Sequence, residues 1–397
     1  MSDFLQHKKA LLDGKTHCTM RRTHRMLHAA FLQFLHSAQF MKLLQRRTNP
    51  IHQISVPRPP NEMPHMKNLC PSKRAALRIL SAASILLCSA TLSLAFAQAW
   101  PTAKPITLVV GYPPGGSTDL TARTLGAELS RKLGQAVVIE NVGGAGGTIG
   151  AQKVASAAPD GYTLLLGSNN EMAISKLVSA AAKYDPLRDF TPIGLVASQP
   201  MVLVASSKSG VKTTDEFIKA AKANPGKFSY GSSGVGTALN LAGEMVKEAS
   251  GTYVVHIPYR GVAPLANDLL GGQLDFGVFV LSSGLPHIKS GKVVALGITE
   301  TKRSAAAPDV PTLSEHPLLK NVNISSWFGL WAPAGLPSAV NQKLTQALAE
   351  SLASADLRKK FEDSGAVTAS ATTPLASFQK LEIDKYERIV KFAKIRE

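Results

Sequence analysis

The sequence predicts an α/β protein made of two doubly wound α/β domains with a ligand cleft between them. Three observations predict this fold class. From Lys104 onward, short apolar runs alternate with helical patterns, as in βαβ units around mainly parallel sheets. The alternation restarts after about residue 205, and the 298 residues from Trp100 onward suit two domains of ordinary size. Loops at the carboxyl ends of the strands would then face the cleft.

The first domain is expected to span 100–204 and to include the returning segment 322–397. Its strands are expected at 106–112, 136–141 and 162–168. The helix after the first strand has leucines at 125, 129 and 133 on one face and a C-terminal glycine at 134. A second helix follows the glycine-rich segment 143–150. Segment 191–207 indicates two short extended runs that carry the chain to the second domain.

The second domain is expected to span 205–321. Its first helix covers 213–224 and is capped by Thr213 or Thr214. Further strands are expected at 228–233, 253–259, 274–280 and 292–298, with helices at 237–251 and 263–272. Segment 324–335 is expected to return as an extended run, and most of the remaining chain is expected to be helical.

The basic charge of the chain is concentrated before residue 100. Residues 1–99 carry 14 of the 44 lysines and arginines but 3 of the 27 acidic residues, and they supply +11 of the net charge of +17. The remainder is only mildly basic, so we expect no nucleic-acid partner. All three cysteines also precede residue 100, which excludes disulfides, a thiol nucleophile and a Cys/His zinc site from the rest. We expect no metal and no cofactor.

Segment 66–99 has the pattern of a secretory signal peptide. Basic residues precede an apolar stretch from Ile79 to about Leu94, which is shorter than a membrane span and ends in small-x-small cleavage sites. Cleavage is expected after Ala97 or Ala99, and the alternative is a retained anchor. Residues 1–65 then indicate a start codon placed too far upstream, with Met66 as the true initiator, or a regulatory extension.

Three glycine-rich motifs lack the residues that catalysis or nucleotide binding would need. Gly111 to Gly116 has the spacing of a phosphate loop, but Ser117 replaces the lysine and the two prolines before Gly115 lack N–H donors. Segment 143–150 has Ile149 where a dinucleotide fingerprint needs glycine, so it is interpreted as a tight turn. Segment 231–236 nearly matches the serine-nucleophile motif Gly-x-Ser-x-Gly, but Val235 stands where the last glycine belongs. We therefore expect no enzyme, and a cleft hydrolase using Ser232 or Ser233 is the alternative from another class.

Strand-end loops rich in hydroxyl, amide and glycine residues recur instead, at 115–119, 168–170, 232–237 and 259–261. Ser117 and Thr237 suit helix N-caps. A helix N-terminus flanked by hydroxyl groups also favours a carboxylate, through its free N–H groups and its dipole. The sequence therefore indicates reversible binding of an anion.

At these residues the chain resembles the tripartite tricarboxylate transporter solute receptors, also called the Bug family of periplasmic binding proteins. The similarity covers 100–397 and includes "YPPGGSTD", "SSGVGT", "HIPYRG", "DLLGGQLD" and "SSWFGLWAPAGLP". It implies a monomeric periplasmic receptor with a two-lobed Venus-flytrap fold. It also implies capture of a small carboxylate, held by the first loop and covered by "SSGVGT", and delivery to a small and a large membrane subunit. A sensor for a signalling system is the alternative. The expected ligand-binding residues are Tyr112, Pro114, Gly115, Gly116, Ser117, Thr118, Asp119, Ser168, Asn169, Asn170, Ser233, Gly236, Thr237, Asn240, Tyr259 and Val280.

The chain departs from the family pattern at positions that face the distal part of the ligand. Val280 stands where many members have a cleft-facing aspartate, and Asn240 where many have histidine or serine. A segment that is usually "HAINP" is altered to 171–175. These changes predict a less acidic pocket that disfavours ligands with an ammonium group. Alternatively, Val280 packs beneath the cleft and Glu171 supplies the charge.

Overall fold

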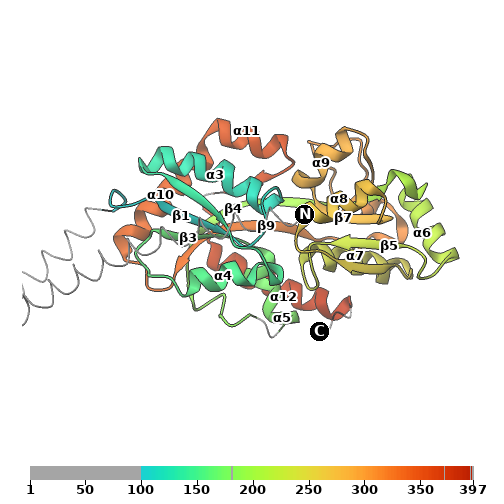
Figure 1. Ribbon diagram of the computed structural model, residues 1–397, viewed down its shortest axis with the longest axis horizontal. Coiled ribbons are helices and arrows are strands. Elements are labelled where there is room, and N and C mark those ends of the chain that lie inside the picture. The colour runs from blue at the N-terminus through green and yellow to red at the C-terminus, as the bar shows by residue number, and fades with distance from the viewer. Residues whose placement is uncertain (1–99, 180–181, 371, 394, 396–397) are drawn as a thin grey trace, which may run out of the picture. The chain divides into compact units, whose positions relative to one another are not determined.

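The computed structural model describes residues 100–179, 182–370, 372–393 and 395, which form an α/β fold around a mixed sheet (Figure 1). The strands are hydrogen-bonded in the order β2-β1-β3-β9-β4-β7-β5-β6, and β8 and β10 also pair with β4. We call the part from β2 to β4, with β10, the first half-sheet. The part from β4 to β6, with β8, is the second half-sheet. Strand β4 belongs to both.

The first half-sheet begins with three parallel strands, β1 (Ile106–Val110), β2 (Val137–Asn141) and β3 (Thr163–Ser168). Helices α3 (Ser117–Leu133) and α4 (Thr148–Ala155) cover opposite faces of it (Figure 1). Alternate residues of β1 explain this, because Leu108 packs in the cluster of α3 while Val109 packs in the cluster of α4. Gly134 ends α3 at a φ of 63°, as predicted.

Strand β4 (Phe190–Ser206) is one continuous strand rather than the two short runs predicted. It pairs antiparallel with β9 (Ser325–Pro333) as far as Pro200, and antiparallel with β7 and β8 from Met201 onward. Each part therefore has its own partners, which keep the whole length extended. The predicted mainly parallel arrangement holds on the outer sides of the half-sheets, whereas the centre is antiparallel.

The second half-sheet repeats the doubly wound pattern with β5 (Ser229–Ser232), β6 (Val255–Pro258), β7 (Phe276–Val280) and β8 (Val293–Ile298). Side chains of α6 (Thr214–Ala223) and α7 (Ala238–Ser250) belong to one hydrophobic cluster. Those of α8 (Val262–Gly271) and α9 (Leu281–Lys289) belong to another. The sequence analysis missed α9, which contains a glycine and a proline and starts directly after β7.

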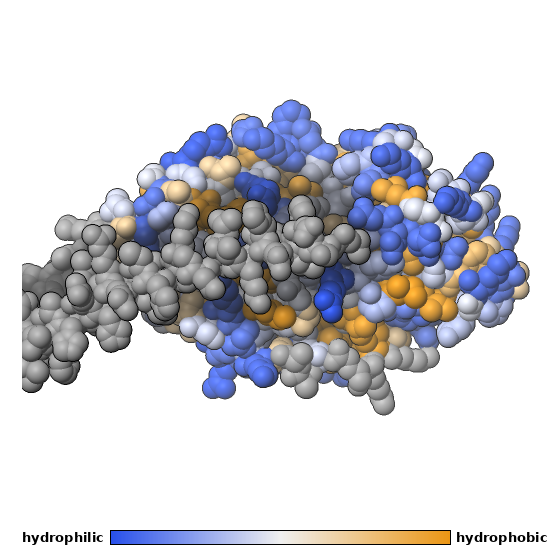
Figure 2. Space-filling model, in the orientation of Figure 1, coloured by the Kyte–Doolittle hydropathy of each residue, from blue (hydrophilic) through white to orange (hydrophobic). Residues whose placement is uncertain are grey.

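The chain after β9 is mostly helical, as predicted. It forms α10 (Ser338–Ala353), α11 (Ala355–Asp363), the short strand β10 (Val367–Thr368) and α12 (Leu375–Phe392). Helix α12 packs against α7 and also against the π-helical turn η2 (Asn170–Ile174), which leads into the short helix α5 (Ser175–Val178). On the face shown in Figure 2, apolar residues form small patches among hydrophilic ones.

The calls on 1–65 and on the signal peptide 66–99 lie outside the described residues. Within the part of the chain that is described, no helix combines the length and the apolar character that crossing a membrane requires. The boundaries of the two expected domains, 100–204 plus 322–397 and 205–321, stay a prediction.

Candidate ligand-binding site

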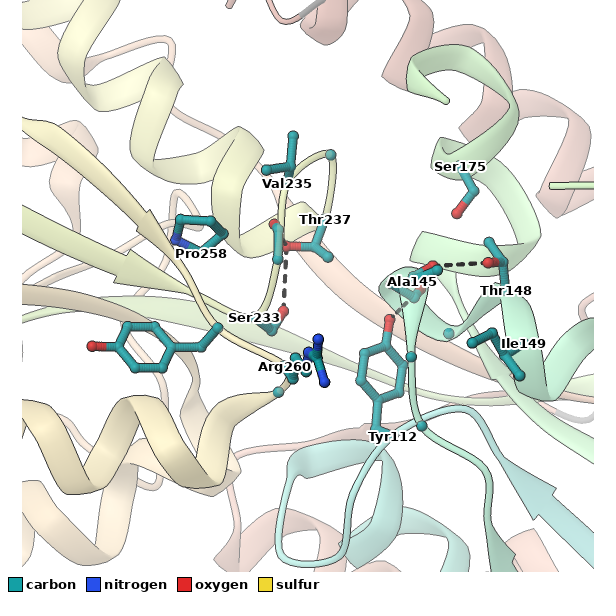
Figure 3. Close-up of a pocket in the computed structure, with 18 of the residues that line it drawn as sticks. Tyr112, Ala145, Thr148, Ile149, Ser175, Ser233, Val235, Thr237, Pro258 and Arg260 are labelled. Atoms are coloured by element: carbon teal, nitrogen blue, oxygen red, sulfur yellow. Dashed lines mark hydrogen bonds between the residues drawn. The ribbon is translucent and has the colours of Figure 1, made fainter. Parts of the chain in front are cut away.

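A cavity of about 930 Å³ lies between loops that follow strands of the two half-sheets (Figure 3). The first half-sheet contributes Tyr112 after β1 and the loop 143–149 after β2. The second contributes the loops 233–237 and 258–261, after β5 and β6. The carboxyl ends of parallel strands meet at one edge of a sheet, which explains why loops distant in sequence converge here.

A smaller cavity of about 30 Å³ adjoins the first and shares Tyr112, Pro113 and Ser233 with it. Its other lining residues are Gly116, Ser117, Thr118, Ser168, Asn170, Ala238, Leu239, Val262, Val280 and Ser326. The first residues of α3 and of α7 both border this cavity. Helix α3 has Gly116 at its N-cap, with no side-chain cap hydrogen bond, so Ser117 is not the cap that the sequence suggested. Two helix N-termini at one small cavity create a positive potential that suits an anion.

Asp119 holds the first loop in place instead of facing either cavity. Its carboxylate accepts hydrogen bonds from Gly115 N, Arg123 Nε and Asn141 Nδ2, each at 2.9 Å. Burial raises the pKa of Asp119, but these hydrogen bonds outweigh it and hold the pKa below its ordinary value. The carboxylate therefore stays ionised and fixes the loop that precedes α3.

A chain of hydrogen bonds crosses the small cavity from one half-sheet to the other. The Tyr112 hydroxyl donates to Gly146 O at 2.7 Å and accepts from Asn170 Nδ2 at 2.6 Å. The Asn170 Oδ1 atom accepts from Ala238 N at 2.7 Å. Asn170 thus caps α7, a helix of the second half-sheet, from a position on the first.

Glu171, next to Asn170, is a buried carboxylate at the back of the cavity wall. Ser168 donates to it from its backbone N at 2.6 Å and from its hydroxyl at 2.7 Å, and the Tyr112 hydroxyl lies 3.4 Å from Oε2. Burial raises the pKa of Glu171 to about 7, although the hydrogen bonds from Ser168 and Tyr112 lower it.

On the opposite wall, the loop before α7 is held by its own hydroxyl and amide groups. Thr237 is the N-cap of α7, as predicted, and accepts from Asn240 N. Its hydroxyl donates to Gly234 O at 2.8 Å and accepts from the Ser233 hydroxyl at 3.2 Å. The Asn240 Oδ1 atom accepts from Gly236 N at 3.0 Å. These internal hydrogen bonds hold the loop in place.

Ser232 and His256 form a serine–histidine contact, but it points away from the cavities. The Ser232 hydroxyl lies 2.7 Å from His256 Nε2, and Ser232 is fully buried and lines neither cavity. The second ring nitrogen of His256 faces the Asn240 amide at 3.4 Å instead of a carboxylate. Burial lowers the pKa of His256 to about 4. A serine nucleophile needs an accessible hydroxyl and an oriented base, and this arrangement lacks the first.

The structure brings most of the predicted site residues together. Those that line one or both cavities are Tyr112, Pro114, Gly116, Ser117, Thr118, Ser168, Asn170, Ser233, Gly236, Thr237, Tyr259 and Val280. Four others, Gly115, Asp119, Asn169 and Asn240, line neither. Asn169 instead donates to the Tyr386 hydroxyl at 2.6 Å and to Ser325 O at 3.2 Å.

Two parts of the wall were not assigned to the site by the sequence analysis. The loop 143–149 was interpreted as a tight turn only; it is such a turn, with Gly144, Gly146 and Gly147 at positive φ, and it also lines the large cavity. Arg260 was placed in a binding loop without a role, and in the view of Figure 3 its side chain stands between Ser233 and Tyr112. The position of Arg260 in a strand-end loop was the sequence signal that could have assigned this cation to the site.

An α/β fold of two half-sheets with a cavity between their loops is that of the two-lobed periplasmic binding proteins. The family described as "Tripartite tricarboxylate transporter family receptor" matches residues 121–394, and the chain belongs to it. It is 35% identical to Protein BugT of Bordetella pertussis, over 74% of this chain and 90% of that protein. The predicted family and fold are confirmed.

Two solved structures are similar over the same region. The periplasmic binding protein BugD is 36% identical, with a TM-score of 0.71 over 74% of this chain and 99% of that one. The R. palustris protein Rpa4515, solved with adipate, is 32% identical, with a TM-score of 0.72 over 75% of this chain and 99% of that one.

Proposed function

We propose that this protein captures a small carboxylate in the cavities between its two half-sheets and delivers it to the small and large membrane subunits of a tripartite tricarboxylate-type transporter. The observation that carries the proposal is the meeting of the N-termini of α3 and α7 at one small cavity. The first turn of α3 has no side-chain cap, and the dipole of α7 adds to the positive potential although Ala238 N and Asn240 N are already bonded. Such a site favours a carboxylate and binds it without any chemical step. The adipate in the similar Rpa4515 structure supports this ligand class.

The proposal includes a periplasmic location and a division of the chain into two lobes. Export to the periplasm by the segment 66–99 agrees with a family of periplasmic receptors. The division into 100–204 plus 322–397 and 205–321 is supported by β4, which changes partners between Pro200 and Met201. Delivery to a transporter is supported by membership of the receptor family.

A thermal-shift screen of the purified chain against a library of mono-, di- and tricarboxylates tests the proposal, with calorimetry on each hit. A rise in melting temperature with at least one carboxylate is expected, because a ligand that binds only the folded state stabilises it. No shift with any carboxylate, or hydrolysis of an ester or amide panel that Ser233→Ala abolishes, would overturn the receptor function.

A glycine pair provides a matched control for the location of the site. At Gly116, a Cβ atom would meet no atom within 4 Å, and it would enter the small cavity. Gly116→Ala should therefore fold and lower carboxylate affinity by roughly tenfold, about 1.4 kcal/mol. Gly271 also has room for a Cβ atom but lies on α8 and lines neither cavity. Gly271→Ala should leave the affinity unchanged.

A further inference from the structure

Glu171 is a buried carboxylate whose hydrogen-bond donors are all neutral. Its side chain is 1% exposed, and the backbone N and the hydroxyl of Ser168 donate to it. The Tyr112 oxygen lies 3.4 Å from Oε2, while its hydroxyl donates to Gly146 O. Ser168 and Tyr112 themselves line the small cavity, whereas Glu171 lies behind them. A change in the charge of Glu171 is therefore transmitted to the cavity through the Ser168 hydroxyl.

The charged groups on the elements around Glu171 are engaged elsewhere. Turn η2 packs against β3, the turn η1 (Ala145–Gly147), α5 and α12, and the first two contain no ionisable residue. On α5, Lys176 lies 4.0 Å from Asp185, and on α12, Lys385 lies 3.4 Å from Glu382. The other charged residues of α12 are exposed.

The ionisable groups that remain near Glu171 are phenols. Tyr112 contacts the carboxylate, Tyr184 donates to Glu171 O at 2.7 Å, and Tyr386 of α12 bonds to Asn169. Burial raises the pKa of each of these phenols, so they remain neutral. Among the described residues, Glu171 has no ion-pair partner, and Arg260, a cation that lines the large cavity, makes no hydrogen bond or ion pair with it.

The ionisation of Glu171 fixes the direction of the hydrogen bonds around it. An ionised carboxylate only accepts, so the single hydroxyl hydrogen of Ser168 points to Glu171, and the Ser168 oxygen accepts from Asn170 N at 3.3 Å. Ser168 then has no hydrogen to offer to the cavity. When Glu171 carries a proton, it can donate to the Ser168 hydroxyl, which releases the Ser168 hydrogen toward the cavity.

We propose that Glu171 is a positioning residue that acts through Ser168, so that the small cavity binds a carboxylate together with the uptake of one proton. The proton comes from water and is held on the Glu171 carboxyl, and no other bond is made or broken. With Glu171 ionised, a bound carboxylate would meet a second negative charge and a Ser168 hydroxyl whose hydrogen is already used. This inference rests on the proposed function.

Calorimetric titration with adipate between pH 6.5 and 8.5 tests the inference, because both carboxyl groups of adipate are ionised throughout this range. With the pKa of Glu171 at about 7 in the ligand-free protein, the affinity of wild type for adipate should fall roughly twentyfold from pH 6.5 to 8.5. In two buffers of different ionisation enthalpy, the heats at pH 8 should report the uptake of about one proton. Glu171→Gln has the shape and the donor of the protonated acid, so its affinity should be nearly independent of pH.

The matched control is Glu300→Gln. Glu300 is a partly buried carboxyl whose pKa is also raised by burial, but it lines neither of the two cavities of the site. This variant should keep the wild-type pH dependence. Adipate binding by wild type that is independent of pH and takes up no proton would overturn the inference and leave the proposed function standing. If neither adipate nor any other carboxylate binds at any pH in this range, the proposed function fails and the inference fails with it.

Discussion

Replacing Glu171 with glutamine should stabilise the folded protein at neutral and alkaline pH. The pKa of Glu171 is raised from 4.5 to about 7 in the folded protein, so the folded state holds a proton that the unfolded state has already lost. The stability that comes from this proton is complete below pH 4.5 and is lost as the pH rises through 7. At pH 8, wild type therefore keeps a buried charge that the glutamine variant does not have.

The size of the effect follows from the shift. A difference of about 2.5 pH units at about 1.4 kcal/mol each gives about 3 kcal/mol. Glutamine can still accept from Ser168 N through its carbonyl oxygen and can donate to the Ser168 hydroxyl through its amide, so few hydrogen bonds are lost. The gain in the free energy of unfolding should therefore be about 2–3 kcal/mol at pH 8 and close to zero at pH 4.5.

Urea denaturation followed by tryptophan fluorescence measures this gain, because Trp327 and Trp331 are fully buried and report on unfolding. The midpoint of Glu171→Gln should exceed that of wild type at pH 8, with an unchanged slope. Glu350→Gln, on the exposed face of α10, is the control and should differ little from wild type at either pH. A glutamine variant that is equally or less stable at pH 8 would refute the argument that Glu171 is an uncompensated buried charge.

Three further predictions concern the cavity and its walls. Adipate should bind more tightly than 2-aminoadipate, because Val280 offers no partner to an ammonium group, and Val280→Asp should narrow the difference in affinity. Calorimetry would contradict this if wild type bound 2-aminoadipate more tightly and Val280→Asp left its affinity unchanged. Asn170→Ala removes the acceptor that caps Ala238 N, so it should lower the free energy of unfolding by about 1 kcal/mol. X-ray scattering should give this variant a larger ligand-free radius of gyration than wild type, and ligand should reduce that radius. Scattering profiles that are identical for the variant and wild type would contradict this. Burial lowers the pKa of His256 from 6.5 to about 4, so the stability that its neutral form provides is complete above pH 6.5 and is lost as the pH falls toward 4. After allowance for the partial exposure of His256, the free energy of unfolding should fall by about 2 kcal/mol over this range. In the Glu171→Gln background, where the opposite trend of Glu171 is absent, urea midpoints should fall over this range, and His256→Gln should remove the fall.

The sequence was sufficient for elements whose local signals are strong. The helix that ends at Gly134 and the helices capped by Thr213 and Thr237 lie where their capping residues predicted them. Helix α9 was missed because Gly284 and Pro286 are poor helix formers, and packing on the second half-sheet outweighs their low propensity. Local propensity predicts an element well only where tertiary contacts do not oppose it.

The candidate site was predicted in composition more than in arrangement. The hydroxyl-rich loops were identified from their positions at strand ends, and most of their residues line the cavities. The burial of Glu171 and the cap from Asn170 to Ala238 depend on which loops meet in space, so no local pattern could show them. For the same reason, the sequence could not separate the ligand-facing residues from Asp119 and Asn169, which hold the walls in place.

The change of partners within β4 has a mechanical consequence. Pro200 is the last residue of this strand that pairs with β9, and Met201 is the first that pairs with β7. Proline has no N–H group, so a twist of the strand at this residue breaks no hydrogen bond that its nitrogen would otherwise donate. The change of partners along β4 thus falls at a residue whose nitrogen has no hydrogen bond to lose. The two hydrogen-bond ladders therefore meet at this residue, whereas one hydrophobic cluster and the contact of α12 with α7 continue across both half-sheets.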